Sequence, residues 1–220
     1  MTLRHPFAAL AAAALAILAL AGCQTNAGTA AHVDDRSVPA SAIDDSYRTL
    51  TQDEVDAYNT QFPSTTGPAT VASLARVARS IVVTFSVRET LLEQAWERSG
   101  GLPSDGALEA LHDRAIVYLF GSSNVPAGSE GDDLVRDQLD WLGVDPDFGA
   151  TMIRSTELLL AFGDDKDVTS DAELAAAVNA TGVEVRLNPR YGSWDTETLS
   201  LGPARLPSYL TDPDATPAAA

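Results

Sequence analysis

The chain has 220 residues and is strongly acidic, with 31 aspartates and glutamates against 14 lysines and arginines and a formal net charge of −17. This balance argues against nucleic acid as a partner and against electrostatic adhesion to anionic lipid, because both require basic clusters. The length is sufficient for one domain with a sizeable hydrophobic core, and an aromatic content of 6% favours helices over an all-β fold.

The N-terminal segment has the features of a lipoprotein signal peptide. A basic start at Arg4 precedes an apolar stretch, residues 7–20, that is too short to span a bilayer comfortably. Leu20-Ala21-Gly22-Cys23 resembles the lipobox of bacterial lipoproteins, and that resemblance implies a diacylglyceryl thioether on Cys23 and removal of residues 1–22. The alternative is an ordinary secretory signal followed by a chance cysteine. With the lipid in place, the protein is expected at the extracytoplasmic face of the cell membrane, held by its acyl chains.

The rest of the chain divides into three parts. Cys23 is the only cysteine, so its lipidation would leave no thiol for a disulfide, a metal site or a nucleophile. Residues 23–30 are expected to form a lipidated tether of small and polar residues. The folded domain is expected over residues 31–210, and residues 211–220 are expected to be a disordered tail.

The first elements are short. Residues 30–34 predict a strand, residues 35–36 a turn, and residues 37–43 the start of a first helix. Thr51 followed three residues later by Glu54 is typical of a capping box, so a second helix is expected to begin there.

Helices dominate the centre of the chain. Residues 69–99 carry apolar side chains at three- and four-residue steps and predict one long helix. Another helix is expected over residues 104–120, and a Gly/Ser/Pro-rich connector is expected to follow it over residues 121–131. A short helix should then end at Gly143, and residues 146–162 predict another.

The C-terminal part returns to extended structure. Residues 163–167 read as an acidic turn, and a second capping box at Ser170 predicts a helix that ends near Gly182. Residues 183–187 alternate apolar and charged side chains, as a half-buried strand does. Residues 199–201 are a candidate third, edge strand.

A lone strand would leave its backbone groups unpaired, so we expect the segments around Val33 and Val185 to pair with each other. The predicted fold class is mainly α: a helical bundle with one long helix and a small β-element formed by the N- and C-terminal strands.

The two ends of this domain carry a family resemblance. Ala30-Ala31-His32-Val33-Asp34 followed by residues 37–44 resembles the start of SurA N-terminal-like chaperone domains, and residues 183–192 with Trp194-Asp195 resemble the strand and turn that close this domain in actinobacterial lipoproteins. The resemblance implies a helical body that holds extended or partly folded polypeptide. Related foldases also carry a parvulin domain of about 90 or more residues. The sequence leaves no room for one after the closing strand, so prolyl isomerase activity is not expected.

No catalytic, metal or cofactor site is predicted. His32 and His112 lack a partner at a useful ligand spacing, and no G-x-S-x-G sequence marks a nucleophilic serine. The aspartates between residues 164 and 171 lack the glycine and the distal glutamate of a calcium loop, so we favour an acidic approach to a helix N-terminus.

Two groups of residues are candidates for binding or closure. Large apolar side chains at helical spacings are expected in the core, and any that lie exposed in a groove become candidates for polypeptide contact; they are Phe85, Trp96, Trp141 and Met152. The second group is expected to form a structural closing turn rather than a binding surface; it comprises Asn188, Pro189, Arg190, Tyr191, Gly192 and Trp194.

The leading functional hypothesis is a non-catalytic, membrane-anchored lipoprotein that binds unfolded or exported polypeptides, as a chaperone-like or docking domain. The alternative is a structural or ligand-carrying lipoprotein that encloses a small apolar molecule or binds one dedicated envelope partner. A hydrolase has the least support.

Overall fold

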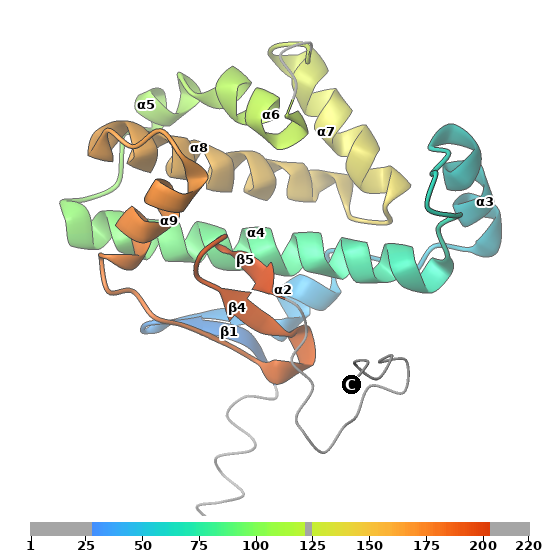
Figure 1. Ribbon diagram of the computed structural model, residues 1–220, viewed down its shortest axis with the longest axis horizontal. Helices are drawn as coiled ribbons and strands as arrows, with labels where there is room; N and C mark the ends of the chain where they lie inside the picture. The colour runs from blue at the N-terminus through green and yellow to red at the C-terminus, as the bar shows by residue number, and fades with distance from the viewer. Residues whose placement is uncertain (1–27, 122–124, 203–220) are drawn as a thin grey trace, which may run out of the picture.

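The computed structural model describes residues 28–121 and 125–202, and its elements stack in layers around two long helices. Figure 1 shows α4 and α8 running side by side, with α5 to α7 beyond α8 and the strands on the opposite side of α4. The helices are α2 (Ala40–Asp44), α3 (Gln52–Gln61), α4 (Val71–Ser99), α5 (Asp105–Glu109), α6 (His112–Phe120), α7 (Ser129–Trp141), α8 (Gly149–Lys166) and α9 (Asp171–Asn179), with 3-10 turns η1 (Pro146–Phe148) and η2 (Pro189–Tyr191). The strands are β1 (Thr29–Val33), β2 (Arg36–Pro39), β3 (Val185–Leu187), β4 (Ser193–Asp195) and β5 (Ser200–Gly202).

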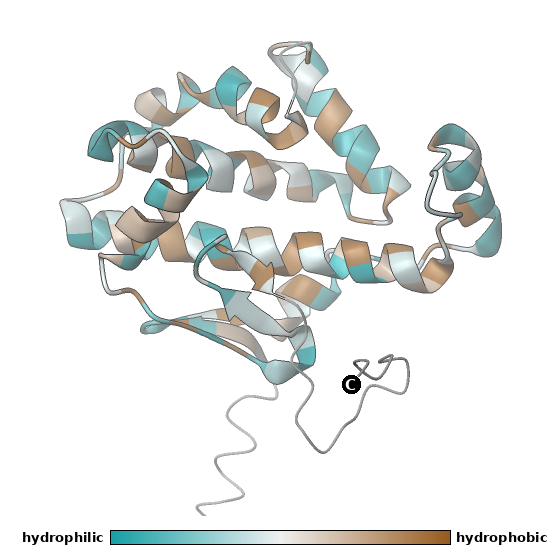
Figure 2. Ribbon diagram, in the orientation of Figure 1, coloured by the Kyte–Doolittle hydropathy of each residue, from teal (hydrophilic) through white to brown (hydrophobic). Residues whose placement is uncertain are grey.

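The main core lies between α4 and α8. Figure 2 shows apolar residues recurring along both helices, and the inward side chains of each are fully buried, such as Val82 and Leu92 on α4 and Leu158 on α8. Burying each aliphatic side chain of this size stabilises the fold by roughly 1.5–3 kcal/mol. The predicted long helix and the mainly α fold class are confirmed.

The predicted pairing of the two ends of the domain is also confirmed. β1 is the central strand of a three-stranded antiparallel sheet with the order β2-β1-β3, in which Val33 lies opposite Val185. The third strand of this sheet is β2, which corrects the expectation that residues 37–43 all belong to the first helix. Asp34 adopts a positive φ of 52°, and this tight turn folds residues 36–39 back onto β1 before α2 begins. β5, the expected edge strand, pairs instead with β4 in a separate two-stranded sheet.

Three helix boundaries differ from the sequence prediction. Residues 104–120 form two helices, because the chain turns at Leu111 and thereby directs both helices against α8. The connector after α6 ends early, since α7 already begins at Ser129. Gly131 lies inside α7, where a Cβ atom would stand only 2.7 Å from the Pro126 carbonyl oxygen. Residues 163–166, expected in an acidic turn, are the last turn of α8.

Helix starts were the most accurate local predictions. The capping boxes at Thr51 and Ser170 both form, with each side chain accepting a hydrogen bond from the backbone N–H three residues later. A third capping box, at Thr70, begins α4. The predicted end of α7 at Gly143 holds as well, because this glycine adopts a φ of +73°.

Some predictions fall outside the described residues. Cys23, the signal segment, most of the tether and the C-terminal tail are among them. Within the described part of the chain, no helix combines the length and the hydropathy needed to cross a lipid bilayer.

Candidate functional site

The four large residues singled out from the sequence lie in different surroundings. Trp96 is 9% exposed; its indole N–H donates to the Leu158 carbonyl oxygen at 3.3 Å and its ring packs edge-on against Phe162. Phe85 and Met152 are half-buried against the main core. Trp141, at the end of α7, is 37% exposed. The structure therefore places Trp96 in the core, where it is not accessible for polypeptide contact, and leaves Trp141 as the most accessible of the four.

Trp141 belongs to a row of aromatic rings that joins α3 to α7. Its ring meets Phe62 edge-on, with centroids 5.8 Å apart and an interplanar angle of 85°. The centroid of the Phe62 ring in turn lies 5.0 Å from that of the Tyr58 ring. Phe62 and Tyr58 are half-buried, so parts of all three rings face solvent. We refer to Tyr58, Phe62 and Trp141 as the aromatic surface.

The aromatic surface rests on a small core of its own. Leu50, Val55 and Leu74 form a buried cluster that is separate from the main core. Asn59 fixes the loop after α3 by accepting a hydrogen bond from the Ala69 N–H at 2.6 Å and donating one to its carbonyl oxygen at 3.0 Å. Val55 is the one buried residue of α3, so few apolar contacts hold this helix to the rest of the domain.

Charged residues border the aromatic surface. Arg48 forms an ion pair with Glu54 on α3 at 2.8 Å and a looser one with Asp140 on α7 at 3.6 Å. These exposed pairs contribute little energy individually. Their effect is to hold α3 beside α7, so that rings from both helices form one continuous surface.

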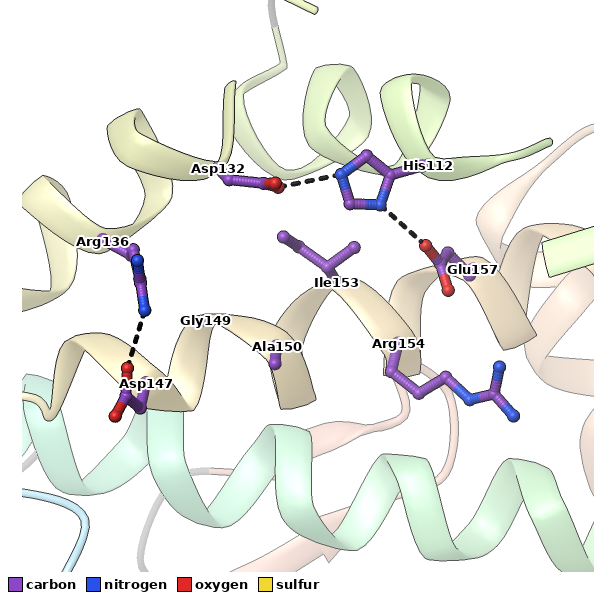
Figure 3. A pocket seen from close by; sticks show the side chains of 9 residues that line it. All are labelled: His112, Asp132, Arg136, Asp147, Gly149, Ala150, Ile153, Arg154 and Glu157. Atoms are coloured by element: carbon purple, nitrogen blue, oxygen red, sulfur yellow. Dashed lines mark hydrogen bonds and ion pairs between the residues drawn. The ribbon is translucent and has the colours of Figure 1, made fainter. Parts of the chain in front are cut away.

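A second candidate is a pocket of about 570 Å³ between α6, α7 and α8, drawn in Figure 3. His112, at the start of α6, bridges two carboxylates from different helices. Its Nε2 lies 2.8 Å from Asp132 of α7 and its Nδ1 lies 3.1 Å from Glu157 of α8. The Glu157 side chain is only 8% exposed. Arg154 and an ion pair between Arg136 and Asp147 at 2.7 Å complete the charged lining (Figure 3).

The geometry of this bridge favours the imidazolium form of His112. Ionised carboxylates only accept hydrogen bonds, so both ring nitrogens must carry a proton for both contacts to be satisfied. Burial lowers the pKa of His112, but the hydrogen bonds and charges of Glu157 and Asp132 outweigh it and raise the pKa above its ordinary value of 6.5. Both ring nitrogens are hydrogen-bonded, so neither is available as a proton acceptor. His112 therefore links α6 to α7 and α8. Within the residues that the structure describes, no three His, Cys, Asp or Glu side chains gather as metal ligands.

The pocket lining was missed by sequence reasoning. The sequence around His112 shows no ligand at a useful spacing, and its two partners in the structure are 20 and 45 residues away along the chain. One local signal is present: Glu157 directly precedes the apolar run of residues 158–162 on α8, and a buried carboxylate requires a partner. The pocket opens to solvent and six of its nine lining residues are ionisable, unlike the closed apolar cavity that a carrier of an apolar ligand requires.

Glu89 on α4 is a carboxyl group whose ionisation is opposed by its surroundings in the folded protein. Burial and the neighbouring charge of Glu93 raise the pKa of the Glu89 carboxyl to about 7, against the opposing effect of Arg154. The folded state therefore resists ionisation of Glu89, and stability falls as the pH rises from 4.5 to 7. We expect Glu89→Gln to raise the free energy of unfolding by about 1 kcal/mol at pH 8 and to have no effect at pH 4.

Urea denaturation at the two pH values measures this difference. Glu109→Gln is the matched control, because Glu109 is exposed on α5 and should change stability at neither pH. An equal gain in the free energy of unfolding of Glu89→Gln at pH 4 and at pH 8 would show that Glu89 is not the group that resists ionisation.

The predicted closing turn lies between β3 and β4 and contacts β1 and α2. Asn188 accepts a hydrogen bond from the Arg190 N–H at 3.2 Å and donates one to the Thr29 carbonyl oxygen at 3.0 Å. Tyr191 is buried, and its hydroxyl donates to Asp44 at 3.1 Å. Pro189 lies in the 3-10 turn, Gly192 follows it with a φ of +117°, and Trp194 packs on the main core from β4; these positions account for the remaining members of the predicted turn.

Comparison of the chain with known protein families, curated proteins and solved structures gives no match in any of the three.

Proposed function

We propose that the protein is a membrane-anchored extracytoplasmic lipoprotein whose helical domain binds exported polypeptides, without catalysis, through the aromatic surface. The single observation that carries this proposal is the partly exposed row of Tyr58, Phe62 and Trp141, whose rings contact one another where α3 meets α7. The anchoring part rests on Cys23 and its preceding apolar segment.

Aromatic rings are effective contacts for varied polypeptides. They present a large apolar area with few rotatable bonds, so little conformational entropy is lost on binding. The parts of such rings that remain accessible to solvent form a small apolar patch, and apolar patches of this kind are typical of interaction sites. Clients whose apolar residues are flanked by lysine or arginine fit best, because the chain carries a net charge of −17.

The binding proposal can be tested with two labelled unstructured peptides that share their apolar residues but differ in carrying flanking lysines or flanking glutamates. Fluorescence anisotropy should show tighter binding of the lysine peptide, and Trp141→Ala should weaken that binding by about fivefold or more, the effect of removing an interface anchor worth at least 1 kcal/mol. Leu102→Ala is the matched control, because Leu102 is 43% exposed but lies after α4, away from the aromatic surface. Equal loss in both variants, or no binding of either peptide, would contradict the proposal.

The anchor has a separate test. Mass spectrometry of the protein from a bacterial membrane fraction should find an N-terminal Cys23 carrying a diacylglyceryl group. A Cys23→Ser variant should leave the membrane fraction. An unmodified, unprocessed N-terminus would rule out lipid anchoring without affecting the peptide-binding result.

A further inference from the structure

A small pocket of about 230 Å³ lies where α4, α6 and α9 meet the connection between β4 and β5. In Figure 1 this connection crosses in front of α4, below α9. Its lining includes one arginine, Arg88, and two acidic residues, Asp171 and Glu197. The pocket is separate from the aromatic surface and from the pocket around His112, so nothing in the proposed function explains it.

Arg88 is the unusual group in this pocket. Its Nε donates to the Leu199 carbonyl oxygen at 3.1 Å, and its guanidinium carbon lies 4.7 Å from the centre of the Phe85 ring. Across the described ranges, no residue accepts a hydrogen bond from either terminal nitrogen of Arg88, and no carboxylate forms an ion pair with it. Burial lowers the pKa of this guanidinium, whereas Tyr118 and Asp171 act in the opposite direction.

Arg88 therefore has two terminal nitrogens that can still donate hydrogen bonds to a ligand. Arg88 is half-buried, and a guanidinium drawn partly out of water without a carboxylate partner costs free energy, of which contact with one aromatic ring offsets only part. The two terminal nitrogens form a fork whose geometry matches a carboxylate. The wall of the pocket that Arg88 forms is therefore suited to the carboxylate of a ligand.

The other polar wall has the opposite charge. The Tyr118 hydroxyl donates to Asp171 at 2.8 Å, which fixes that carboxylate at the pocket, and Glu197 lies exposed on the β4–β5 connection. A simple anion would be repelled by these two carboxylates. A ligand that carries an ammonium group beside its carboxylate satisfies both walls.

The remaining lining is aliphatic, and the pocket is too small for a bulky molecule. Leu159, Leu174, Ala175 and Leu199 provide its apolar surface. We propose that this pocket binds a free α-amino acid with a small aliphatic side chain, its carboxylate on the Arg88 fork, its ammonium group near Asp171 and Glu197, and its side chain against the leucines.

Isothermal titration calorimetry with the full chain tests this assignment. L-Alanine and L-valine are the first probes, with alanine amide and N-acetylalanine as ligands that lack one of the two charges. Binding of a free amino acid and at least about tenfold weaker binding of both derivatives is expected, because each loses a charge-assisted hydrogen bond. No binding of any amino acid, or equal binding of N-acetylalanine, would overturn the proposal.

Variants then locate the site. Arg88→Gln should abolish binding, and circular dichroism will show whether this variant is folded. Glu197→Gln is the safer substitution, because Glu197 is exposed on a connection, and it should weaken binding of the amino acid without changing stability. Glu109→Gln, at an exposed site on α5, is the matched control. Full binding by folded Arg88→Gln and by Glu197→Gln would place the amino acid elsewhere and overturn the assignment.

Discussion

Replacing Trp96 by alanine should lower the free energy of unfolding by about 3–5 kcal/mol, the range for an aromatic side chain removed from a packed core. The indole joins the two long helices, since it packs edge-on against Phe162 at 5.3 Å and donates its N–H to the backbone of Leu158. Its loss leaves a cavity where α4 and α8 are in contact. Urea denaturation followed by circular dichroism measures the effect.

Trp141→Ala is the informative comparison for Trp96→Ala. Trp141 is partly exposed at the end of α7, so its removal should change stability much less, by about 1 kcal/mol or less. We thus expect Trp96→Ala to lower mainly the stability of the fold, and Trp141→Ala to weaken mainly the binding of polypeptide. A Trp96→Ala protein that keeps full stability but no longer binds peptide would show that the indole acts at the surface.

The effect of His112→Ala on stability should depend on pH. At pH 5.5 we expect a loss of about 2 kcal/mol, because removal of the imidazolium leaves the buried Glu157 carboxylate without its partner. The folded pKa of His112 is raised, so its stabilising effect is complete below the ordinary value of 6.5 and is lost as the pH rises through the raised pKa. By pH 8.5 the difference in free energy of unfolding between the variant and the parent protein should be clearly smaller than at pH 5.5.

The measurement is a series of urea denaturation curves for parent and variant between pH 5.5 and pH 8.5. The curves of free energy against pH should converge at the alkaline end. Parallel curves would show that His112 contributes by packing and not by its charge. Glu109→Gln again provides a control whose difference from the parent should stay near zero at every pH.

Local sequence signals predicted most helices, since capping and apolar periodicity act over three to seven residues. Thr51 and Ser170 begin helices where the sequence places them, and the stripe over residues 69–99 forms α4. β2 was missed because four residues carry no clear alternation. It exists only because the turn at Asp34 returns the chain to β1.

The candidate sites were harder to predict because each is assembled from distant segments. Phe62 and Trp141 are 79 positions apart in the sequence and meet only when α3 packs beside α7. Tyr58 and Phe62 are four residues apart, which is one helical turn and the one local signal for this surface. Nothing local indicates that Trp96 is buried while Trp141 is not, because both lie near the C-terminal ends of amphipathic helices.

The central position of β1 has a mechanical consequence for a chain tethered through Cys23. Tension from such a tether would reach the folded domain at β1, which is hydrogen-bonded along both edges, to β2 and to β3. A pull along the strand loads both ladders in shear, so several bonds must break together before the strand can slide out. The attachment point would thus lie on the strand of this sheet that is hydrogen-bonded on both sides.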